Sequence, residues 1–129
     1  MGSFYPVLVS DRFVDTVNFY EDFFGFVPAI EEEGYVMLKG QDNPGLQIAV
    51  FDTKHKCLSD RVPPVQGLIL SLEVGDAKAA YDRLYMEGLE LYKEYGRDLH
   101  GRPHFVVYDP NGVLVNVFEK LPVTDCLAC

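Results

Sequence analysis

The chain has 129 residues, of which 48% are hydrophobic and 24% are charged, a composition typical of a soluble globular domain rather than a disordered chain. This length suits one compact domain or two half-domains around a continuous core. The formal net charge of −9 argues against a nucleic-acid partner, because a phosphate-binding surface needs clustered Lys and Arg side chains. No apolar run is long enough to span a membrane and the start shows no export signal, so we expect no membrane contact and a cytoplasmic location.

The first part of the chain predicts the element order β-α-β-β-β. A short apolar strand over residues 4–9 stops at Ser10-Asp11, and we expect Asp11 to cap the helix that follows. This helix ends at Gly25 and carries a predicted apolar stripe of Phe13, Val14, Val17, Tyr20 and Phe24. Three more strands are predicted over residues 26–30, 35–39 and 46–51.

The second part of the chain repeats this order after a connecting segment. Residues 53–66 contain Pro63-Pro64 and no sustained periodicity, which is typical of a connection. A strand over 67–74 leads to a helix that Asp76 caps and that ends at Gly88, with Ala77, Ala80, Tyr81 and Leu84 on one face. Strands follow over 89–95, 105–108 and 113–118, and the turn residues Asp109-Pro110-Asn111-Gly112 join the last two.

A faint internal repeat supports two modules. Val7 to Asp11 parallels Leu72 to Asp76, and Ile48 to Asp52 parallels Val115 to Glu119. We therefore predict an α+β fold with a first βαβββ module over 4–52, a connection over 53–66, a second module over 67–121 and a C-terminal tail over 122–129. A sheet with one helix leaves its other face uncovered, so two such modules can pair and enclose a cleft, the default ligand site.

Three motifs connect the chain to a known family: Val9-Ser10-Asp11 before a helix, Asn18-Phe19-Tyr20 followed by Phe24-Gly25-Phe26, and Tyr108-Asp109-Pro110-Asn111-Gly112 before the last strand. Together they resemble the vicinal-oxygen-chelate superfamily of glyoxalase I, bleomycin-resistance proteins and extradiol dioxygenases. The resemblance covers residues 4–121 and implies a curved mixed sheet around a cleft. It leaves the function open, because this fold carries both metal-dependent enzymes and binding proteins without a metal.

The resemblance also implies where a metal ion would be bound. Related enzymes take ligands seven residues before each helix-capping Asp and from the last strand of each module, and the residues at these positions here are Phe4, Ile69, Ala49 and Asn116. If the alignment slips by two residues, Gln47 replaces Ala49 on the same face. Three hydrocarbon side chains offer no donor to a divalent cation, so we expect no metal and no cofactor at this position.

The period of two along a strand predicts which side chains face the cleft. Counted from the four positions above, they form a largely apolar set: Phe4, Pro6, Leu8, Gln47, Ala49, Phe51, Ile69, Ser71, Leu114, Asn116 and Phe118. In similar proteins, further strands and loops reach the cleft. The residues on them here, which we expect at the wall or rim of the cleft, are Tyr35, Met37, Tyr95, Arg102 and His104. The alternative is that each aromatic belongs only to the core. The predicted ligand-binding residues are Phe4, Tyr35, Met37, Gln47, Ile69, Ser71, Tyr95, Arg102, His104 and Asn116.

These residues favour a metal-independent binding protein for a planar or amphipathic organic molecule. The resemblance to the antibiotic-sequestering branch, whose members are acidic dimers that hold a cationic drug, implies a cationic or aromatic ligand, an antibiotic or aromatic metabolite, and a homodimer. The alternative is a glyoxalase-like lyase, isomerase or dioxygenase with a non-standard or absent metal site, in which His104 is the general base and Arg102 or Tyr95 stabilises an oxyanion. A protein-interaction module would need an exposed apolar patch.

Other chemistry-bearing residues favour ordinary roles. Cys57, Cys126 and Cys129 are an odd number of cysteines, so we expect free thiols, and Cys126-Leu-Ala-Cys129 lacks the second pair that a structural zinc requires. His55 and Cys57 are expected at the surface. Gly101 and Pro103 make a helix between His100 and His104 improbable, so a loop or strand edge is expected there.

Overall fold

The computed structural model describes residues 2–58, 61–63 and 65–122, and it divides into two compact units, Met1–Pro64 and Val65–Cys129. The predicted Cys126/Cys129 pair lies outside the described residues. The first unit contains β1 (Val7–Ser10), α1 (Phe13–Phe24), β2 (Phe26–Glu32), β3 (Tyr35–Gly40) and β4 (Gln47–Asp52). The second unit contains β5 (Ile69–Val74), α2 (Ala77–Met86), β6 (Leu91–Arg97), β7 (Pro103–Tyr108) and β8 (Leu114–Glu119). Both units therefore have the predicted order β-α-β-β-β.

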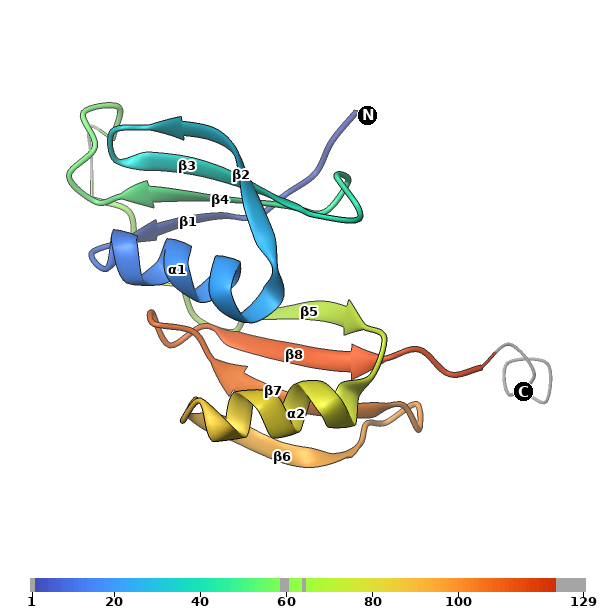
Figure 1. Cartoon of the computed structure of the whole chain (residues 1–129). Coiled ribbons are helices and arrows are strands. Elements are labelled where there is room, and N and C mark those ends of the chain that lie inside the picture. Colours follow the sequence, from blue (N-terminus) through green and yellow to red (C-terminus); the bar gives the residue numbers. More distant parts are fainter. Residues whose placement is uncertain (1, 59–60, 64, 123–129) are drawn as a thin grey trace. The chain divides into compact units, whose positions relative to one another are not determined.

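Each unit is a four-stranded mixed sheet, with strand order β1-β4-β3-β2 in the first and β5-β8-β7-β6 in the second. The first and last strands of each unit, β1 with β4 and β5 with β8, run parallel, and the other pairs are antiparallel. One helix lies along one face of each sheet, as Figure 1 shows for α1 and α2 separately. This is the α+β arrangement that the sequence predicts. None of the helices among the described residues is long and apolar enough to cross a membrane.

The core of each unit lies between its helix and its sheet. In the second unit, α2 buries Ala77, Ala80 and Leu84 against alternate residues of the two central strands. These are the fully buried side chains of Phe105, Val107, Val115 and Val117. Full burial of a Val, Leu or Phe side chain stabilises the fold by about 1.5–3 kcal/mol. This layer therefore holds α2 on one face of the sheet, and the opposite face remains for other contacts.

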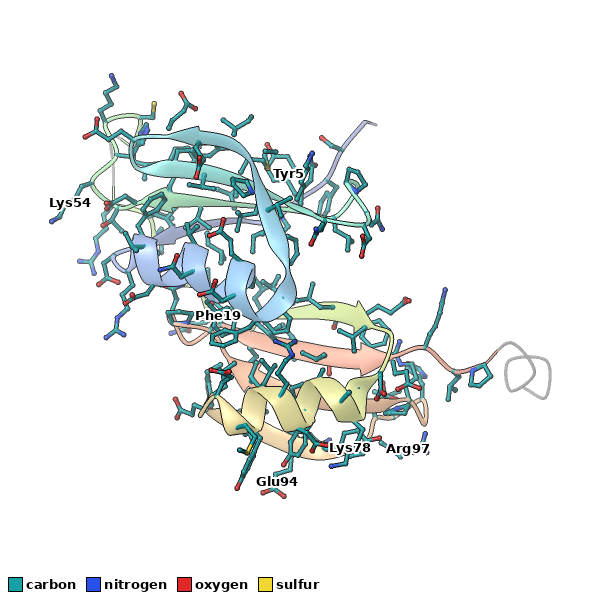
Figure 2. All side chains as sticks on the ribbon, viewed as in Figure 1. Tyr5, Phe19, Lys54, Lys78, Glu94 and Arg97 are labelled. Atoms are coloured by element: carbon teal, nitrogen blue, oxygen red, sulfur yellow. The ribbon has the colours of Figure 1, made fainter. Side chains whose placement is uncertain are left out.

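Helix α1 has nearly the predicted length but a different buried stripe. Val17 and Tyr20 are buried as expected, whereas Val14 is 65% exposed and the prediction for it is wrong. Thr16 and Phe19, the latter labelled in Figure 2, are buried instead. The Thr16 hydroxyl donates to the carbonyl of Arg12 at 2.7 Å and lies 3.2 Å from Ser10 Oγ, so a polar residue is satisfied inside the core. The helix ends, as predicted, at Gly25 in the left-handed region with a φ of 70°.

The two helices begin differently, and this corrects the alignment of the modules. The Asp76 carboxylate accepts a hydrogen bond from the backbone N–H of Ala79 at 3.0 Å, which confirms the predicted cap of α2. The prediction for Asp11 is wrong, because Arg12 occupies the N-cap position of α1 without a side-chain cap. Ser10 Oγ accepts the Arg12 N–H at 2.8 Å instead. Arg12, not Asp11, therefore corresponds to Asp76.

The hairpin between β7 and β8 follows the predicted turn. Asp109 Oδ1 accepts backbone N–H bonds from Asn111 at 2.7 Å and from Val113 at 2.9 Å. Gly112 has a φ of 79°, a conformation that favours glycine. This tight turn fixes the register in which β8 carries Leu114, Asn116 and Phe118 beside β7.

Candidate functional site

The face of the β5-β8-β7-β6 sheet that points away from α2, called here the helix-free face, carries the polar residues of the candidate site. Val115 and Val117 are buried on the α2 side, so Leu114, Asn116 and Phe118 lie on the helix-free face. The parallel register places Ile69 beside Leu114 and Ser71 beside Asn116. The predicted inward-facing set of the second module therefore does share one face.

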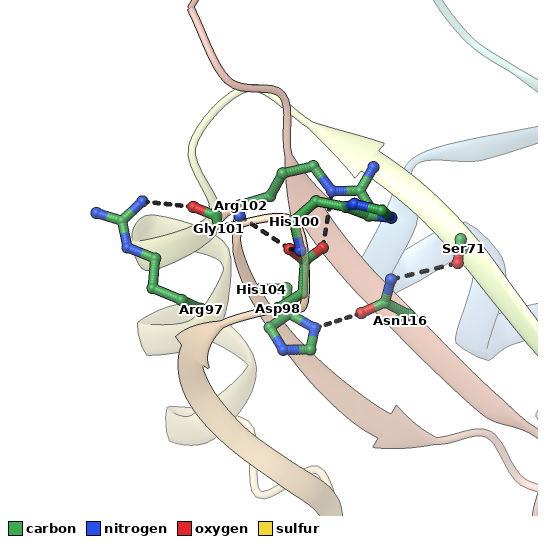
Figure 3. Close-up of polar contacts among 8 residues, drawn as sticks. All are labelled: Ser71, Arg97, Asp98, His100, Gly101, Arg102, His104 and Asn116. Carbon is green, nitrogen blue, oxygen red and sulfur yellow. Dashed lines mark hydrogen bonds and ion pairs between the residues drawn. The ribbon is translucent and has the colours of Figure 1, made fainter. Parts of the chain in front are cut away.

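A directed chain of hydrogen bonds runs across three strands of this face (Figure 3). His104 Nδ1 lies 2.8 Å from Asn116 Oδ1, and Asn116 Nδ2 donates to Ser71 Oγ at 3.2 Å. Because the amide oxygen only accepts, Nδ1 carries the proton and donates. Ser71 Oγ then serves as an acceptor toward Asn116, and its own O–H remains to be donated outward. The chain begins in the interior, where His104 is 6% exposed, and ends at the exposed Ser71.

The other nitrogen of His104 has no hydrogen bond. Nε2 is buried and has no partner among the described residues. When Nδ1 carries the proton of a neutral ring, Nε2 holds a lone pair and is an acceptor. A buried polar atom without a partner costs about 1–3 kcal/mol. The bond to Asn116 and the surrounding packing therefore hold this ring in place without help from Nε2.

An apolar hollow of about 410 Å³ is lined by Ile69 and Leu114, which neighbour Ser71 and Asn116 along the same strands. Its walls come from the segment that leads into β5, from β6 and from the β7-β8 hairpin: Val65, Gln66, Gly67, Leu68, Ile69, Tyr92, Tyr108, Gly112, Val113 and Leu114. Tyr92 and Tyr108 meet edge to face with 5.8 Å between ring centroids. Ile69 and Leu114 each lie two residues before Ser71 and Asn116 on the same strands, so the hollow and the Ser71 hydroxyl share the helix-free face.

Arg102 lies at the other end of this face and is held by Asp98. Its Nε donates to Asp98 Oδ2 at 2.7 Å, and its backbone N–H donates to Oδ1 at 2.8 Å. Burial alone raises the pKa of Asp98, but hydrogen bonds from Arg102 and from the His100 backbone outweigh it and lower the pKa to about 2. The guanidinium lies 4.2 Å from the ring centroid of Phe118, a cation–π contact. Arg102 is thus a fixed, partly exposed cation.

Tyr95 lies on the opposite face from Ser71. Its ring is 5.7 Å from that of Tyr81 on α2, so it packs on the helix side of the sheet. The pairing of β6 with β7 shifts register between Leu91 and Lys93 and again between Lys93 and Gly96. At these irregularities the side chains of β6 no longer alternate regularly between the two faces of the sheet. The structure therefore does not bring Tyr95 together with His104 and Arg102.

In the first unit, the face opposite α1 contains three of the predicted residues. Met37 pairs with Ala49, and Gln47 lies two residues before Ala49 on β4. Tyr35 packs on Phe51 with 4.5 Å between ring centroids. Burial raises the pKa of the Tyr35 hydroxyl, and the nearby Tyr5 and Glu32 raise it further.

The predicted inward face of the first strand is wrong by one residue. Val7 and Val9, not Pro6 and Leu8, pair with Ala49 and Phe51. Leu8 is buried, and its partner Val50 is fully buried in the core. Phe4 precedes the strand and is 88% exposed. Tyr5, labelled in Figure 2, takes the position that corresponds to Ile69. Matching the modules by the starts of their helices, rather than by their aspartates, would have found Tyr5.

With this correspondence, the four positions at which the resemblance implies metal ligands are Tyr5, Ala49, Ile69 and Asn116. Two of these are hydrocarbon, and among the described residues no three His, Cys, Asp or Glu side chains gather closely enough to bind a metal ion. This donor set does not fit a divalent cation, which needs several carboxylate, imidazole or thiolate ligands.

His55 and Cys57, which are predicted at the surface, make a local hydrogen bond. The backbone N–H of Cys57 donates to His55 Nδ1 at 3.0 Å, and the exposed Cys57 thiol is free.

Solved structures share this fold at low sequence identity. An integron cassette protein from the mobile metagenome of V. cholerae is 17% identical, with a TM-score of 0.71 over 94% of this chain and 96% of that one. A glyoxalase-related enzyme from Fulvimarina pelagi is 16% identical, with a TM-score of 0.74 over 93% and 89%. A lactoylglutathione lyase from Agrobacterium tumefaciens is 19% identical, with a TM-score of 0.70 over 92% and 94%. The chain has no significant match among curated proteins.

The sequence itself matches a family over most of its length. Residues 5–117 fit the Glyoxalase/Bleomycin resistance protein/Dioxygenase superfamily, and the matched segment runs from before β1 into β8, the last strand of the second unit. The fold and the motifs around Gly25 and Asp109 agree with this match. The chain therefore belongs to the Glyoxalase/Bleomycin resistance protein/Dioxygenase superfamily.

Proposed function

We propose that this protein binds a small aromatic molecule on the helix-free face of its second unit, without a metal ion. The observation that carries the proposal is the chain of hydrogen bonds from His104 through Asn116 to Ser71, which ends beside the apolar hollow. The hollow takes the flat apolar body of the ligand. The Ser71 hydroxyl donates to one acceptor on it, such as a carbonyl oxygen.

The direction of the chain gives this site its selectivity. His104 donates to the amide oxygen of Asn116, which orients the amide so that its nitrogen faces Ser71. The hydroxyl proton is then left to be donated outward to a strong acceptor, and such a bond strengthens the bonds before it in the chain. A ligand with an acceptor at this point is favoured over one that presents a donor. His104 and Asn116 thus act as positioning residues for Ser71.

The hollow also limits the class of ligand. A volume of about 410 Å³ falls in the range of roughly 300–1,000 Å³ for small-molecule pockets. The Tyr92 and Tyr108 rings provide edges and faces for aromatic contacts. An aromatic metabolite or the aromatic part of an antibiotic suits these walls, and the net charge of −9 favours a neutral or cationic molecule over an anion.

An enzyme of the same fold is the second candidate, and one observation supports it. The lone pair on His104 Nε2 has no partner, as a general base requires. Against it, Nε2 is buried, Arg102 is held by Asp98, and Tyr95 lies on the α2 side of the sheet. These positions favour binding over catalysis. Turnover of a bound compound that disappears in His104→Gln while its affinity persists would support the enzyme instead.

The fluorescent naphthyl ketone prodan tests the proposal, because it combines an aromatic body with a carbonyl acceptor and its emission reports the polarity around it. We expect saturable binding with emission shifted to the blue. Ser71→Ala removes a hydrogen bond with a net value of about 0.5–1.5 kcal/mol, so the Kd should rise roughly two- to tenfold. Ile69→Gln places an amide in the apolar wall and should weaken binding further.

Leu99→Gln is the matched control, because Leu99 is 90% exposed and lies outside the hollow. It should leave the Kd of prodan unchanged. Equal affinities in the parent protein, Ser71→Ala and Ile69→Gln would show that prodan binds elsewhere and would contradict the proposed site.

Two parts of the sequence-based prediction belong to this proposal as well. Tyr35, Met37 and Gln47 stay predicted ligand contacts of the first unit, whereas the place predicted for Phe4 passes to Tyr5. Substitution of each of these residues by Ala tests its contribution to prodan binding. We also propose a homodimer, which light scattering of the purified protein tests directly.

A further inference from the structure

A second candidate site lies between α2 and β6, on the side of the sheet opposite the helix-free face. Tyr81 and Tyr85 lie one turn apart on α2, with 5.9 Å between their ring centroids. Tyr95 on β6 adds a third ring, 5.7 Å from Tyr81. Tyr85 is 60% exposed although it is a large aromatic residue. These three rings form a cluster that the core of the unit covers only in part.

The cluster already holds a cation. Lys78 Nζ lies 5.4 Å from the ring centroid of Tyr81 and 5.6 Å from that of Tyr95, within the range of cation–π contacts. The same ammonium donates to Asp82 Oδ1 at 2.7 Å. Figure 2 labels Lys78 on this helix. The ring faces and the carboxylate therefore provide attraction for positive charge on this surface.

A hollow of about 370 Å³ opens beside these groups. It is lined by two tyrosines, a methionine and two carboxylates: Tyr81, Asp82, Tyr85, Met86 and Glu94. The lining contains no Lys or Arg. Aromatic rings with nearby carboxylates are the combination that recognises ligands with a charged head and apolar substituents, because the rings contact the methyl groups while the carboxylates balance the charge.

We propose that this hollow, the α2 tyrosine site, binds a small organic cation of the quaternary ammonium class. A primary ammonium is strongly hydrated and is best served by a direct carboxylate bond, as Lys78 shows with Asp82. A quaternary ammonium has no N–H to donate and gains more from ring faces and the Met86 side chain. The site is independent of the Ser71 site, because Tyr81 and Tyr95 lie on the opposite side of the sheet.

Tetramethylammonium chloride is the probe, titrated into protein with isotope-labelled tyrosine rings and compared with sodium chloride at the same ionic strength. We expect saturable shifts in the ring resonances of Tyr81, Tyr85 and Tyr95 with tetramethylammonium and none of that pattern with sodium. Tyr85→Leu keeps an apolar side chain but removes one ring, so the Kd should rise about two- to fivefold. Lys78→Gln removes a competing positive charge and should lower the Kd.

Phe13→Leu is the matched control, because Phe13 is a partly exposed aromatic residue that lines neither this hollow nor the one beside Ile69. It should leave the Kd unchanged, and Glu94→Gln should raise it in a protein whose amide spectrum is otherwise unaltered. The proposal is wrong if sodium produces the same shifts, if the shifts do not saturate, or if Tyr85→Leu and Phe13→Leu behave alike. None of these outcomes depends on prodan binding at Ser71.

Discussion

His104 and Asn116 lie on neighbouring strands but are not directly opposite each other, and a hydrogen bond of 2.8 Å between Nδ1 and Oδ1 joins them diagonally. The residue opposite His104 is Phe118, and the residue opposite Asn116 is Val106. Diagonal neighbours on one face of a sheet are within reach of long side chains. This geometry leaves the Asn116 amide nitrogen directed to Ser71 on the far side of β8.

Removing the amide should destabilise the protein. Asn116→Leu keeps the volume but leaves the buried Nδ1–H of His104 without an acceptor, so we expect a loss of about 1–3 kcal/mol in the free energy of unfolding, measured with urea. Ser71→Ala alters only the exposed end of the chain and should cost less than about 1 kcal/mol. Equal losses in both variants would mean that the bond to His104 contributes nothing of its own.

The two helix starts provide a matched pair of substitutions. Asp76→Ala removes the side-chain cap of α2 and should lower the free energy of unfolding by about 0.5–2 kcal/mol. Asp11→Ala should change it little, because Asp11 does not cap α1. Thermal and urea unfolding of both variants measure the difference. A larger loss in Asp11→Ala would contradict the corrected alignment of the two modules.

Asp98 should make stability depend on pH in the acid range. Its pKa is about 2 in the folded protein and is expected near the ordinary value of 3.8 in the unfolded chain. Because the folded pKa is the lower one, the stabilisation is complete above about pH 4 and is lost as the pH falls toward 2. Asp98→Asn should flatten the stability profile between these values, as urea unfolding at a series of pH values would detect. An unchanged slope would mean that other carboxylates produce the acid sensitivity.

Substitutions in the core of the second unit should lower the free energy of unfolding far more than substitutions on the exposed side of α1. Leu84→Ala removes a fully buried side chain of α2 and should cost about 2–5 kcal/mol. Val14→Ala changes a side chain that is 65% exposed and should cost less than about 0.5 kcal/mol. Comparable losses would show that Val14 is covered in solution.

The sequence predicts the fold well because periodicity and turn chemistry act locally. The C-terminal end of α1 follows from Gly25, and the turn between β7 and β8 follows from Asp109 and Gly112, because these residues have strong conformational preferences. The face of the first strand does not follow from such local signals, and the prediction for it is wrong. Asp11 and Asp76, each just before a helix, suggest an alignment of the modules that the structure shifts by one residue. In a strand such a shift moves every side chain to the other face.

The site was only partly predictable for the same reason. Ser71, Asn116 and His104 were all predicted to face the ligand, and in the structure they form one chain of hydrogen bonds. Tyr95 could not be placed, because the irregular pairing of β6 is invisible in a pattern of alternating residues. The apolar hollow depends on the packing of Val65 and Tyr92 near the β7-β8 hairpin, which the sequence does not specify.

The tautomer of His104 tests the central claim most directly. Nitrogen NMR of the imidazole ring at a pH of about 8.5, well above the ordinary imidazole range, distinguishes a protonated from an unprotonated ring nitrogen. We predict a proton on Nδ1 and none on Nε2, which makes Asn116 donate to Ser71 and leaves the Ser71 hydroxyl to donate to a ligand. A proton on Nε2 with Nδ1 bare would reverse the amide, engage the Ser71 proton internally and contradict the proposed site.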